Sequence, residues 1–334
     1  MHAAINRRKD QSIETLRGVA IVLVVTYHVI TGPALATVDG SMLVLQHLSA
    51  VFDYVRMPLF TVITGYVYAL RPAGADLAGF YRRKARRLLL PLVTLSTLEY
   101  LARAYLPGVT VVEPVDGIWR IYLYGYMHYW FIMAVFWSFL VIGYLDHRRL
   151  LERHRHWQLC FVIALAFNLF VPRPALLSLG AGFYLLPFFL LGYGLNRYGA
   201  LLLRPFVVGT CGVLFVICMG AEQLLRYEQF AVAGYTQRAL ALAVGVTANV
   251  LIFRYRRAWR PLAFVGSFAY FIYLAHAFSV GIGSRFAGML VDSMQNPGVF
   301  FAACMVFGLG LPIAAQILCS RYRWFRLPFL GLPR

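Results

Sequence analysis

Five ionisable side chains lie in stretches of this sequence that are otherwise apolar. His28, Arg56, Glu99 and His276 lie well inside such stretches, and His128 lies near the start of another. An ionisable group in an apolar environment costs free energy, so each of these positions is a candidate for a functional site. A carboxylate beside an imidazole fixes its tautomer and stabilises its protonated form. Such a pair is suited to general base catalysis on a hydroxyl group.

Helical spacing predicts how deep these side chains lie. At about 1.5 Å per residue from the flanking arginine, His28 lies about 16 Å and Glu99 about 18 Å from the basic edge. Arg56 lies at about 22 Å and His276 at about 24 Å. His28 and Glu99 are therefore expected at one depth, with Arg56 and His276 somewhat above them. His128 is expected at or near the opposite edge.

A purely structural interpretation of the same residues stays open. Glu99 and Arg56 could form a structural ion pair between two helices. The histidines could then hydrogen-bond between helices without taking part in any reaction.

The stretches that hold these residues are those of a polytopic membrane protein. The chain has 334 residues, of which 61% are hydrophobic and 13% charged, whereas soluble domains contain about 25% charged residues. An aromatic content of 16% excludes a disordered chain. The five cysteines lie in or beside apolar runs and form no C-x-x-C pair, which excludes a disulfide-stapled module. We expect an all-α bundle, because lipid permits only helices or closed barrels.

About ten transmembrane helices are expected. The stretches are roughly 15–35, 47–70, 88–106, 121–145, 158–173, 181–196, 203–221, 236–254, 261–282 and 298–319. The fifth and sixth are short and flank Pro172 and Pro174, so they are expected to be tilted or broken. With no internal repeat and no long polar insertion, residues 1–334 are expected to form a single transmembrane domain.

The basic residues predict the orientation of the chain. With the N-terminus in the cytoplasm, 24 of the 31 lysines and arginines fall on cytoplasmic segments. Both termini are therefore expected in the cytoplasm. The net charge of +18 follows this topology, and because no aromatic and basic stripe lies on a soluble element, no nucleic-acid partner is expected.

Several short motifs occur in an order typical of one family of membrane enzymes. Arg17 and His28 are separated by ten residues in the first stretch, and M-P-L-F at 57–60 precedes T-G-Y at 64–66. An R-x-x-R pattern lies in the basic segment 80–91, and H-Y-W-F occupies 128–131. Further blocks lie at 186–193 and 266–276. The ordered set, over about 15–320, resembles the acyltransferase-3 family of membrane O-acyltransferases, with Thr64 where the family usually has serine.

The resemblance implies a function. Members of this family transfer an acyl group, usually acetyl, from cytoplasmic acyl-CoA to hydroxyls of extracytoplasmic or lipid-linked glycans. The chain is thus expected to be an O-acetyltransferase of the bacterial inner membrane, with acetyl-CoA as co-substrate and a glycan as acceptor. The resemblance also implies that Arg17 and His28 are functional and that the R-x-x-R segment serves the donor.

The basic segment has the chemistry that a CoA site needs. Arginine forks bind phosphate through paired charge-assisted hydrogen bonds. Arg83 and Arg86 are the expected phosphate ligands, with Arg82 and Arg87 as the alternatives in register. A pantetheine arm of roughly 15–20 Å would reach the depth of His28. The alternative is that this segment is a positive-inside anchor that contacts anionic membrane lipids.

His28 is the expected general base or covalent acyl relay, with Arg17 and Glu99 as further catalytic candidates. The expected acceptor-binding residues are Arg56, His128, Trp130 and His276. For the aromatic residues around Trp130, an interfacial aromatic belt is the alternative. No metal site is expected, because the histidines lack H-x-x-x-H spacing and no cysteine accompanies them.

Two other functions remain open from the sequence. A transporter or flippase of a glycan intermediate or small anion would also be polytopic, but it typically shows inverted repeats and paired broken helices. A non-catalytic membrane subunit of a polysaccharide assembly complex would not need both Arg17 and His28.

Overall fold

The computed structural model describes residues 10–32, 35, 43–105, 115–227, 234–290 and 296–333. In these ranges the secondary structure is helical, apart from a single bridge between Tyr124 and Leu176. The longer helices are α1 (Gln11–Ile30), α3 (Asp53–Leu70), α4 (Leu77–Tyr105), α6 (Trp130–His147), α7 (His154–Phe170), α8 (Leu179–Arg197), α10 (Pro205–Tyr227), α11 (Gly234–Tyr255), α13 (Ala269–Leu290) and α14 (Pro297–Cys319). The predicted all-α membrane bundle is confirmed.

Short helices connect or extend these elements. They are α2 (Leu43–Val51), η1 (Val115–Gly117), α5 (Arg120–Leu123), η2 (Met127–Tyr129), α9 (Gly199–Leu202), α12 (Arg260–Ser267) and α15 (Arg323–Leu330). The sequence did not predict α15, which packs against the first half of α4. The fifth and sixth stretches were expected to be tilted or broken, but α7 and α8 are each unbroken, and Pro172 and Pro174 lie in the connection between Phe170 and Leu179.

In the described residues every predicted span falls on a helix or on consecutive helices, while residues 33, 34 and 106 of the first and third spans lie outside the described residues. The spans differ in how apolar they are. Among the described residues, six helices are long and apolar enough to cross a membrane: α1, η2 with α6, α8, α10, α11 and α14. The pair α12–α13, bent by 77°, would make a seventh. The predicted spans on α3, α4 and α7 fall short of this requirement. In α3 and α4 the difference comes partly from buried charged residues, which belong to the candidate site below.

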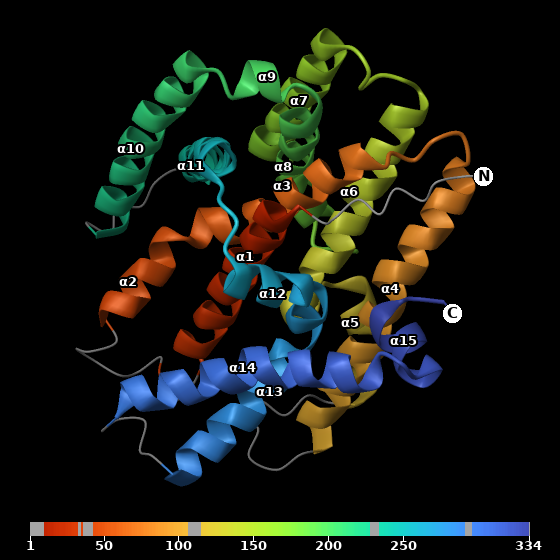
Figure 1. The fold of residues 1–334 in the computed structure, drawn as a ribbon, viewed down its shortest axis with the longest axis vertical. Helices are drawn as coiled ribbons and strands as arrows, with labels where there is room; N and C mark the ends of the chain where they lie inside the picture. The colour runs from red at the N-terminus through yellow and green to blue at the C-terminus, as the bar shows by residue number, and fades with distance from the viewer. Residues whose placement is uncertain are drawn as a thin grey trace.

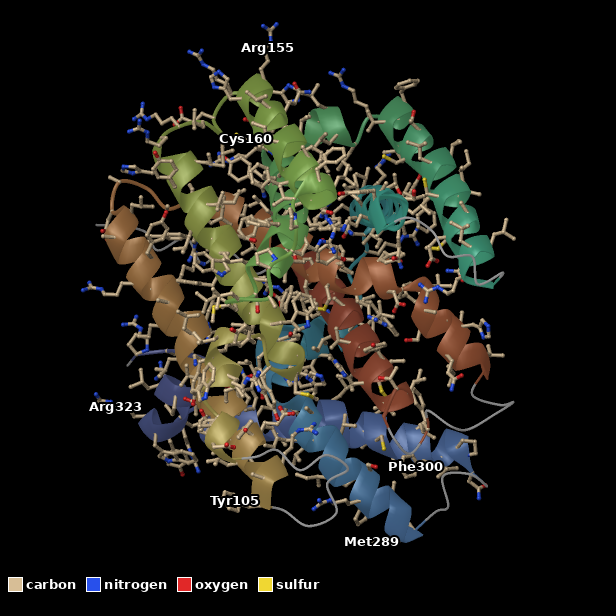
Figure 2. The ribbon with its side chains drawn as sticks, turned by 180° about the vertical axis from the view of Figure 1, so that it is seen from behind. Tyr105, Arg155, Cys160, Met289, Phe300 and Arg323 are labelled. Atoms are coloured by element: carbon tan, nitrogen blue, oxygen red, sulfur yellow. The ribbon has the colours of Figure 1, made fainter. Side chains whose placement is uncertain are left out.

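The helices form a bundle around α1, α3 and α8 (Figure 1). Helix α3 packs along α8, and α6 and α7 cover the other sides of α8. Helix α1 contacts α3, α12, α13 and α14, while α10 packs on α11 at the edge of the molecule. Tyr105 and Met289 lie at one end of the molecule and Arg155 at the other, while Arg323 of α15 lies nearer to the end of Tyr105 than to that of Arg155 (Figure 2). The orientation of the chain in a membrane stays a prediction.

Glycines let helix backbones touch at two crossings, α1 with α12 and α3 with α8. An added Cβ at Gly18 of α1 would meet the Leu262 carbonyl of α12, and one at Gly266 would meet the Glu14 carbonyl of α1. In the same way Gly65 of α3 faces the carbonyl of Phe189 on α8. A methyl group has no room at these crossings, so the small residues set the separation between helices.

The bend after α12 brings one chain segment to both ends of α1. Helix α12 crosses the first half of α1 at Gly18, and α13 then contacts α1 as well. The change of direction occurs at Phe268, between the two helices. As a result, the candidate residue His276 on α13 is carried towards the C-terminal half of α1.

We predict that Gly65→Ala destabilises the protein by about 1–3 kcal/mol, because the new methyl group must push α3 away from α8. The matched control is Gly212→Ala on α10, where nothing lies within 4 Å of an added Cβ. That change should be neutral or slightly stabilising, since alanine is the better helix former. Thermal unfolding of the purified protein in detergent measures both. Equal stability of the two variants would contradict the close α3–α8 approach.

Candidate active site

Three histidines from separate parts of the chain meet inside the bundle. We call His28 of α1, His128 of η2 and His276 of α13 the histidine cluster. Their ring centroids are 4.8 Å apart for His28 and His276, 4.5 Å for His128 and His276, and 6.1 Å for His28 and His128. His276 and His128 are buried, whereas His28 is partly accessible. The cluster therefore has one member that a bound molecule could reach.

The orientation of His276 follows from its hydrogen bond. Its Nδ1 lies 2.7 Å from the backbone carbonyl oxygen of Tyr273, one helical turn earlier. A carbonyl oxygen can only accept, so Nδ1 carries the proton and Nε2 of the neutral ring has a free lone pair. That Nε2 is buried and has no hydrogen-bond partner among the described residues. His276 thus offers an acceptor inside the cluster.

Two tyrosine hydroxyls hold His128 against α13. The Tyr273 hydroxyl donates to the backbone carbonyl of His128, and the Tyr129 hydroxyl donates to the carbonyl of Leu274 at 3.1 Å. The Nε2 of His128 is buried without a hydrogen-bond partner in the described part of the chain. His128 was expected at or near the outer interface, and the structure instead packs its buried ring against His276. The reason is that η2 enters the bundle before α6 begins.

Arg56 lies next to the cluster through Tyr27. The guanidinium of Arg56 is 3.9 Å from the centroid of the Tyr27 ring, and that ring is 5.1 Å from the His28 ring. Arg56 donates to the carboxylate of Asp53 at 2.6 Å and to the backbone carbonyl and hydroxyl of Ser49 at 3.3 Å. This buried cation is therefore held in place by neighbours on α2 and α3.

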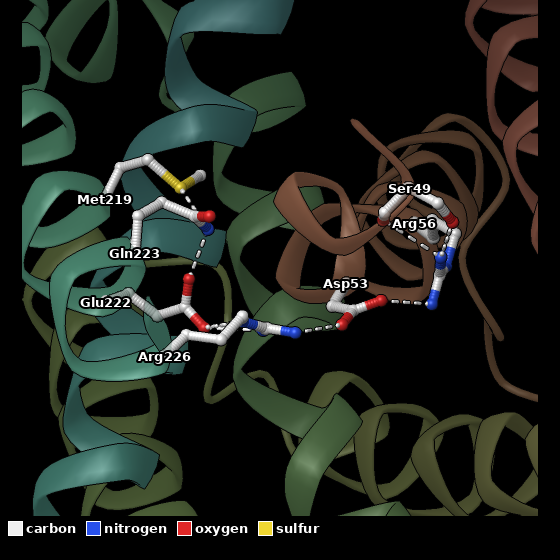
Figure 3. Close-up of polar contacts among 7 residues, drawn as sticks. All are labelled: Ser49, Asp53, Arg56, Met219, Glu222, Gln223 and Arg226. Carbon is white, nitrogen blue, oxygen red and sulfur yellow. Dashed lines mark hydrogen bonds and ion pairs between the residues drawn. The ribbon is translucent and has the colours of Figure 1, made fainter. Parts of the chain in front are cut away.

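The Asp53 carboxylate continues this network to α10 (Figure 3). Its second oxygen accepts from Arg226 at 3.1 Å, and Arg226 also donates to Glu222 at 2.9 Å. We call Arg56, Asp53, Arg226 and Glu222 the ion-pair chain. Two cations alternate with two carboxylates in it, so the chain as a whole carries no net charge. This pairing offsets the free energy of placing charged groups away from water.

Glu99 has a different partner from those expected. Its carboxylate lies 3.3 Å from the Arg103 guanidinium one turn along α4, so the structural ion pair with Arg56 is not formed. The Tyr129 hydroxyl also lies at this carboxylate, and the Tyr129 ring is 4.1 Å from the His128 ring. Glu99 therefore approaches the histidine cluster from the His128 side. A role for Glu99 beside His28 stays a prediction that these contacts do not support.

The predicted donor arginines lie along one flank of α4. Arg82 and Arg83 are exposed, and Arg83 pairs with Asp76 at 3.3 Å. The backbone N–H of Gly79, and Arg83 after it, lower the pKa of the Asp76 carboxyl. Arg86 is half-buried, and its Nε has no hydrogen-bond partner among the described residues. Arg83 and Arg86 thus keep donors that a phosphate could use.

The other two basic residues of the segment have structural partners. Arg87 donates to the Leu330 carbonyl of α15, and its guanidinium is 4.3 Å from the Tyr270 ring centroid. The Lys84 ammonium lies 3.8 Å from the centroid of the Phe139 ring. Burial, together with the charges of Arg87 and Arg83, lowers the pKa of Lys84 to about 8. Of the four arginines predicted to bind the donor, Arg87 has the most contacts with other helices, and its role is therefore structural.

Arg17 and Trp130 lie outside the histidine cluster. Arg17 pairs with Glu14 at 2.8 Å in the first half of α1, about 16 Å along the helix from His28. Trp130 begins α6, and its ring stands 6.0 Å from the Phe131 ring in an edge-to-face contact. Sequence reasoning missed Tyr273 and Arg103. Their only signals were their spacing, three residues before His276 and four residues after Glu99.

One cavity lies beside the site, and another lies at the far end of α6 from His128. One of about 250 Å³ lies at the C-terminal end of α1, lined by Tyr27, Ile30, Thr31, Gln46, Ser49, Ala50 and Asp53, and we call it the α1–α3 cavity. Another of about 760 Å³ is lined by residues of the α3–α4 and α6–α7 connections and the end of α8, including Asp146, Arg149 and Arg197. The first is next to the histidine cluster, since Tyr27 precedes His28.

Comparison with known proteins gives one positive result. The family model described as an acyltransferase domain matches residues 10–317, which include every candidate residue named above. No curated protein and no solved structure matches the chain. Within the described residues, no group of three or more histidine, cysteine, aspartate or glutamate side chains has the arrangement to hold a metal ion.

We predict that Arg103→Met destabilises the protein more than Glu99→Gln does. Removing Arg103 leaves the buried Glu99 carboxylate unpaired, which costs about 1–3 kcal/mol for this partly exposed pair. Glu99→Gln removes the charge and leaves an amide that Arg103 can still contact. Thermal unfolding in detergent compares the two. A larger loss of stability for Glu99→Gln than for Arg103→Met would contradict the claim that Arg103 compensates the buried Glu99 carboxylate.

Proposed function

The chain belongs to the acyltransferase-3 family, and from this we propose that it moves an acetyl group from acetyl-CoA to a hydroxyl of a glycan. The observation that carries the proposal is the histidine cluster, in which a partly accessible His28 adjoins two buried imidazoles. Acyl transfer to a hydroxyl needs a base at the attacking oxygen, and an imidazole is the side chain best suited to that task near neutral pH.

In the proposed reaction His28 removes the proton of the acceptor hydroxyl. The alkoxide oxygen then forms a bond to the thioester carbonyl carbon. As the tetrahedral intermediate collapses, the carbon–sulfur bond breaks and the CoA thiolate leaves. The proton held by His28 passes to the thiolate, so the ring returns to its neutral form. In an acyl-histidine relay, the His28 nitrogen would instead attack the thioester carbon, the carbon–sulfur bond would break and the CoA thiolate would leave. The acceptor oxygen would then attack the acetyl-histidine, the carbon–nitrogen bond would break, and the hydroxyl proton would pass to the thiolate.

His276 supports this role as a positioning residue. With its Nδ1–H held by the Tyr273 carbonyl, its Nε2 lone pair can accept an N–H from the neighbouring His28 ring. That bond would leave the other His28 nitrogen unprotonated and ready to act as a base. His276 would thus fix the tautomer of the His28 ring, which is the role that the sequence suggested for Glu99.

The developing oxyanion needs positive charge or hydrogen-bond donors. Arg56 is the nearest candidate, because its guanidinium stacks on the ring of Tyr27 beside His28. Asp53 and Ser49 fix its position, so it would need little reorganisation when the charge forms. Tyr27 could add its hydroxyl, while Arg17 and Thr64 stay as sequence-based candidates.

For the donor we propose phosphate contacts from Arg83 and Arg86, with Arg82 at the exposed rim. The support is that Arg86 keeps an unpaired buried Nε and that Arg83 has only an exposed aspartate as its partner. Acetyl-CoA would enter from the cytoplasm, with both chain termini on that side, and the glycan acceptor from the other. The setting proposed for this single domain is the bacterial inner membrane.

We predict that His28→Ala reduces acetyl transfer by about 10²–10⁴-fold while acetyl-CoA still binds, as expected for loss of a general base. Arg83→Ala/Arg86→Ala should instead raise the KM for acetyl-CoA. The matched control is Arg204→Ala, at an exposed arginine distant from α4 in the sequence. The assay is transfer of radiolabel from acetyl-CoA to lipid-linked glycans in liposomes. Failure of the wild-type protein to bind acetyl-CoA would contradict the proposal.

We predict that His276→Asn lowers kcat for the same transfer by about 10- to 100-fold, because His28 loses the acceptor that fixes its tautomer. The KM for acetyl-CoA should not change, and the pH dependence of kcat should shift. A variant that folds normally and keeps the wild-type pH profile would contradict the positioning role.

A further inference from the structure

The α1–α3 cavity has a lining that is chemically mixed. Tyr27, Thr31 and Ser49 contribute hydroxyl groups, Gln46 contributes an amide, and Asp53 contributes a carboxylate. Ile30 and Ala50 add apolar surface. Amides and hydroxyls can both donate hydrogen bonds to hydroxyl groups and accept them, and a carboxylate can accept them. An aromatic ring packs against C–H groups. This combination is suited to a ligand that carries several hydroxyls on a carbon ring.

The charges around the cavity disfavour an anion. Asp53 is the only charged residue among the described residues that line it. The cations nearby are Arg56 and Arg226, and both direct their guanidinium groups to carboxylates of the ion-pair chain (Figure 3). Since that chain carries no net charge, an incoming carboxylate or phosphate would meet the oxygens of Asp53 while both nearby cations are already paired with carboxylates.

The position of the cavity connects it with the reaction. Tyr27 lines the cavity, and its ring contacts the His28 ring and the Arg56 guanidinium. A ligand held against Tyr27 therefore lies one residue from the proposed base. The volume of about 250 Å³ suits a single ring, since pockets for drug-sized ligands measure about 300–1,000 Å³.

We propose that the α1–α3 cavity is the acceptor pocket and that it selects an uncharged sugar residue over an acidic or phosphorylated one. This rests on the proposed acyltransferase function. Asp53 and Gln46 are its specificity-determining residues. Asp53 excludes anions and accepts from sugar hydroxyls, and Gln46 contacts the ring hydroxyls from the α2 side.

The test measures acceptor preference with two sets of matched probes. The neutral set consists of the methyl glycosides of glucose, galactose and mannose, and the anionic set of the corresponding methyl uronates. Purified protein in liposomes receives radiolabelled acetyl-CoA, and label on each acceptor gives the ratio of kcat/KM values. Binding of acetyl-CoA is measured separately, so that failure of the donor half of the reaction is seen by itself.

The wild-type protein should prefer the neutral set by at least about tenfold, given the size of a charge–charge interaction near a protein surface. Gln46→Lys places a cation in the cavity without breaking the ion-pair chain, and it should shift the ratio towards the uronates by about tenfold. Asp53→Asn should shift it in the same direction, because it removes the carboxylate partner of Arg56 while Arg226 keeps Glu222. The KM for acetyl-CoA should stay unchanged in both.

The matched control is Gln158→Lys, the same substitution at an exposed position on α7, which should keep the wild-type ratio. A wild-type preference for uronates would overturn the proposal. So would variants at Gln46 and Asp53 that change acetyl-CoA affinity but not the acceptor ratio, or a protein that binds acetyl-CoA yet acetylates no member of the neutral set. Absence of acetyl-CoA binding would instead remove the proposed function itself.

Discussion

The contact on which the candidate site depends is the close crossing of α1 and α12 at Gly18 and Gly266. No side chain separates the two backbones there, so the position of α12 on α1 is fixed tightly. The 77° bend to α13 then determines where His276 arrives, and it arrives 4.8 Å from His28. Because lipid offers no hydrophobic driving force between helices, close packing of small residues has to provide this precision.

A second constraint is that every buried charge must be compensated within the bundle. Glu99 has Arg103 on its own helix, while Asp53 joins Arg56 on α3 to Arg226 on α10. The charged residues partly explain why α3 and α4 are less apolar than the other helices. These two helices carry the polar groups that lie beside the histidine cluster, and α4 also carries the basic segment. These two helices of low hydropathy are therefore the ones that carry most of the candidate functional residues.

The sequence predicted the helical membrane fold and the positions of the ten helical stretches, and it singled out each of the three histidines without predicting that they meet. It placed His128 too far from the others, because depth arithmetic assumes straight helices that begin where the apolar stretch begins. The short η2 helix and the bent α12–α13 pair break that assumption. The partner of Glu99 was also not predicted from the sequence. Its partner, Arg103, lies on the same helix, whereas a comparison of depths pointed to Arg56 and His28.

The most direct test of this account is a cryo-EM structure of the protein with a non-hydrolysable acetyl-CoA analogue. The account predicts that the nucleotide lies against Arg83 and Arg86 at the start of α4. It further predicts that the acetyl carbonyl carbon lies within reach of attack by an oxygen held at His28, at about 3–3.5 Å from that oxygen position. An analogue bound with its acetyl group away from the histidine cluster would contradict the central claim.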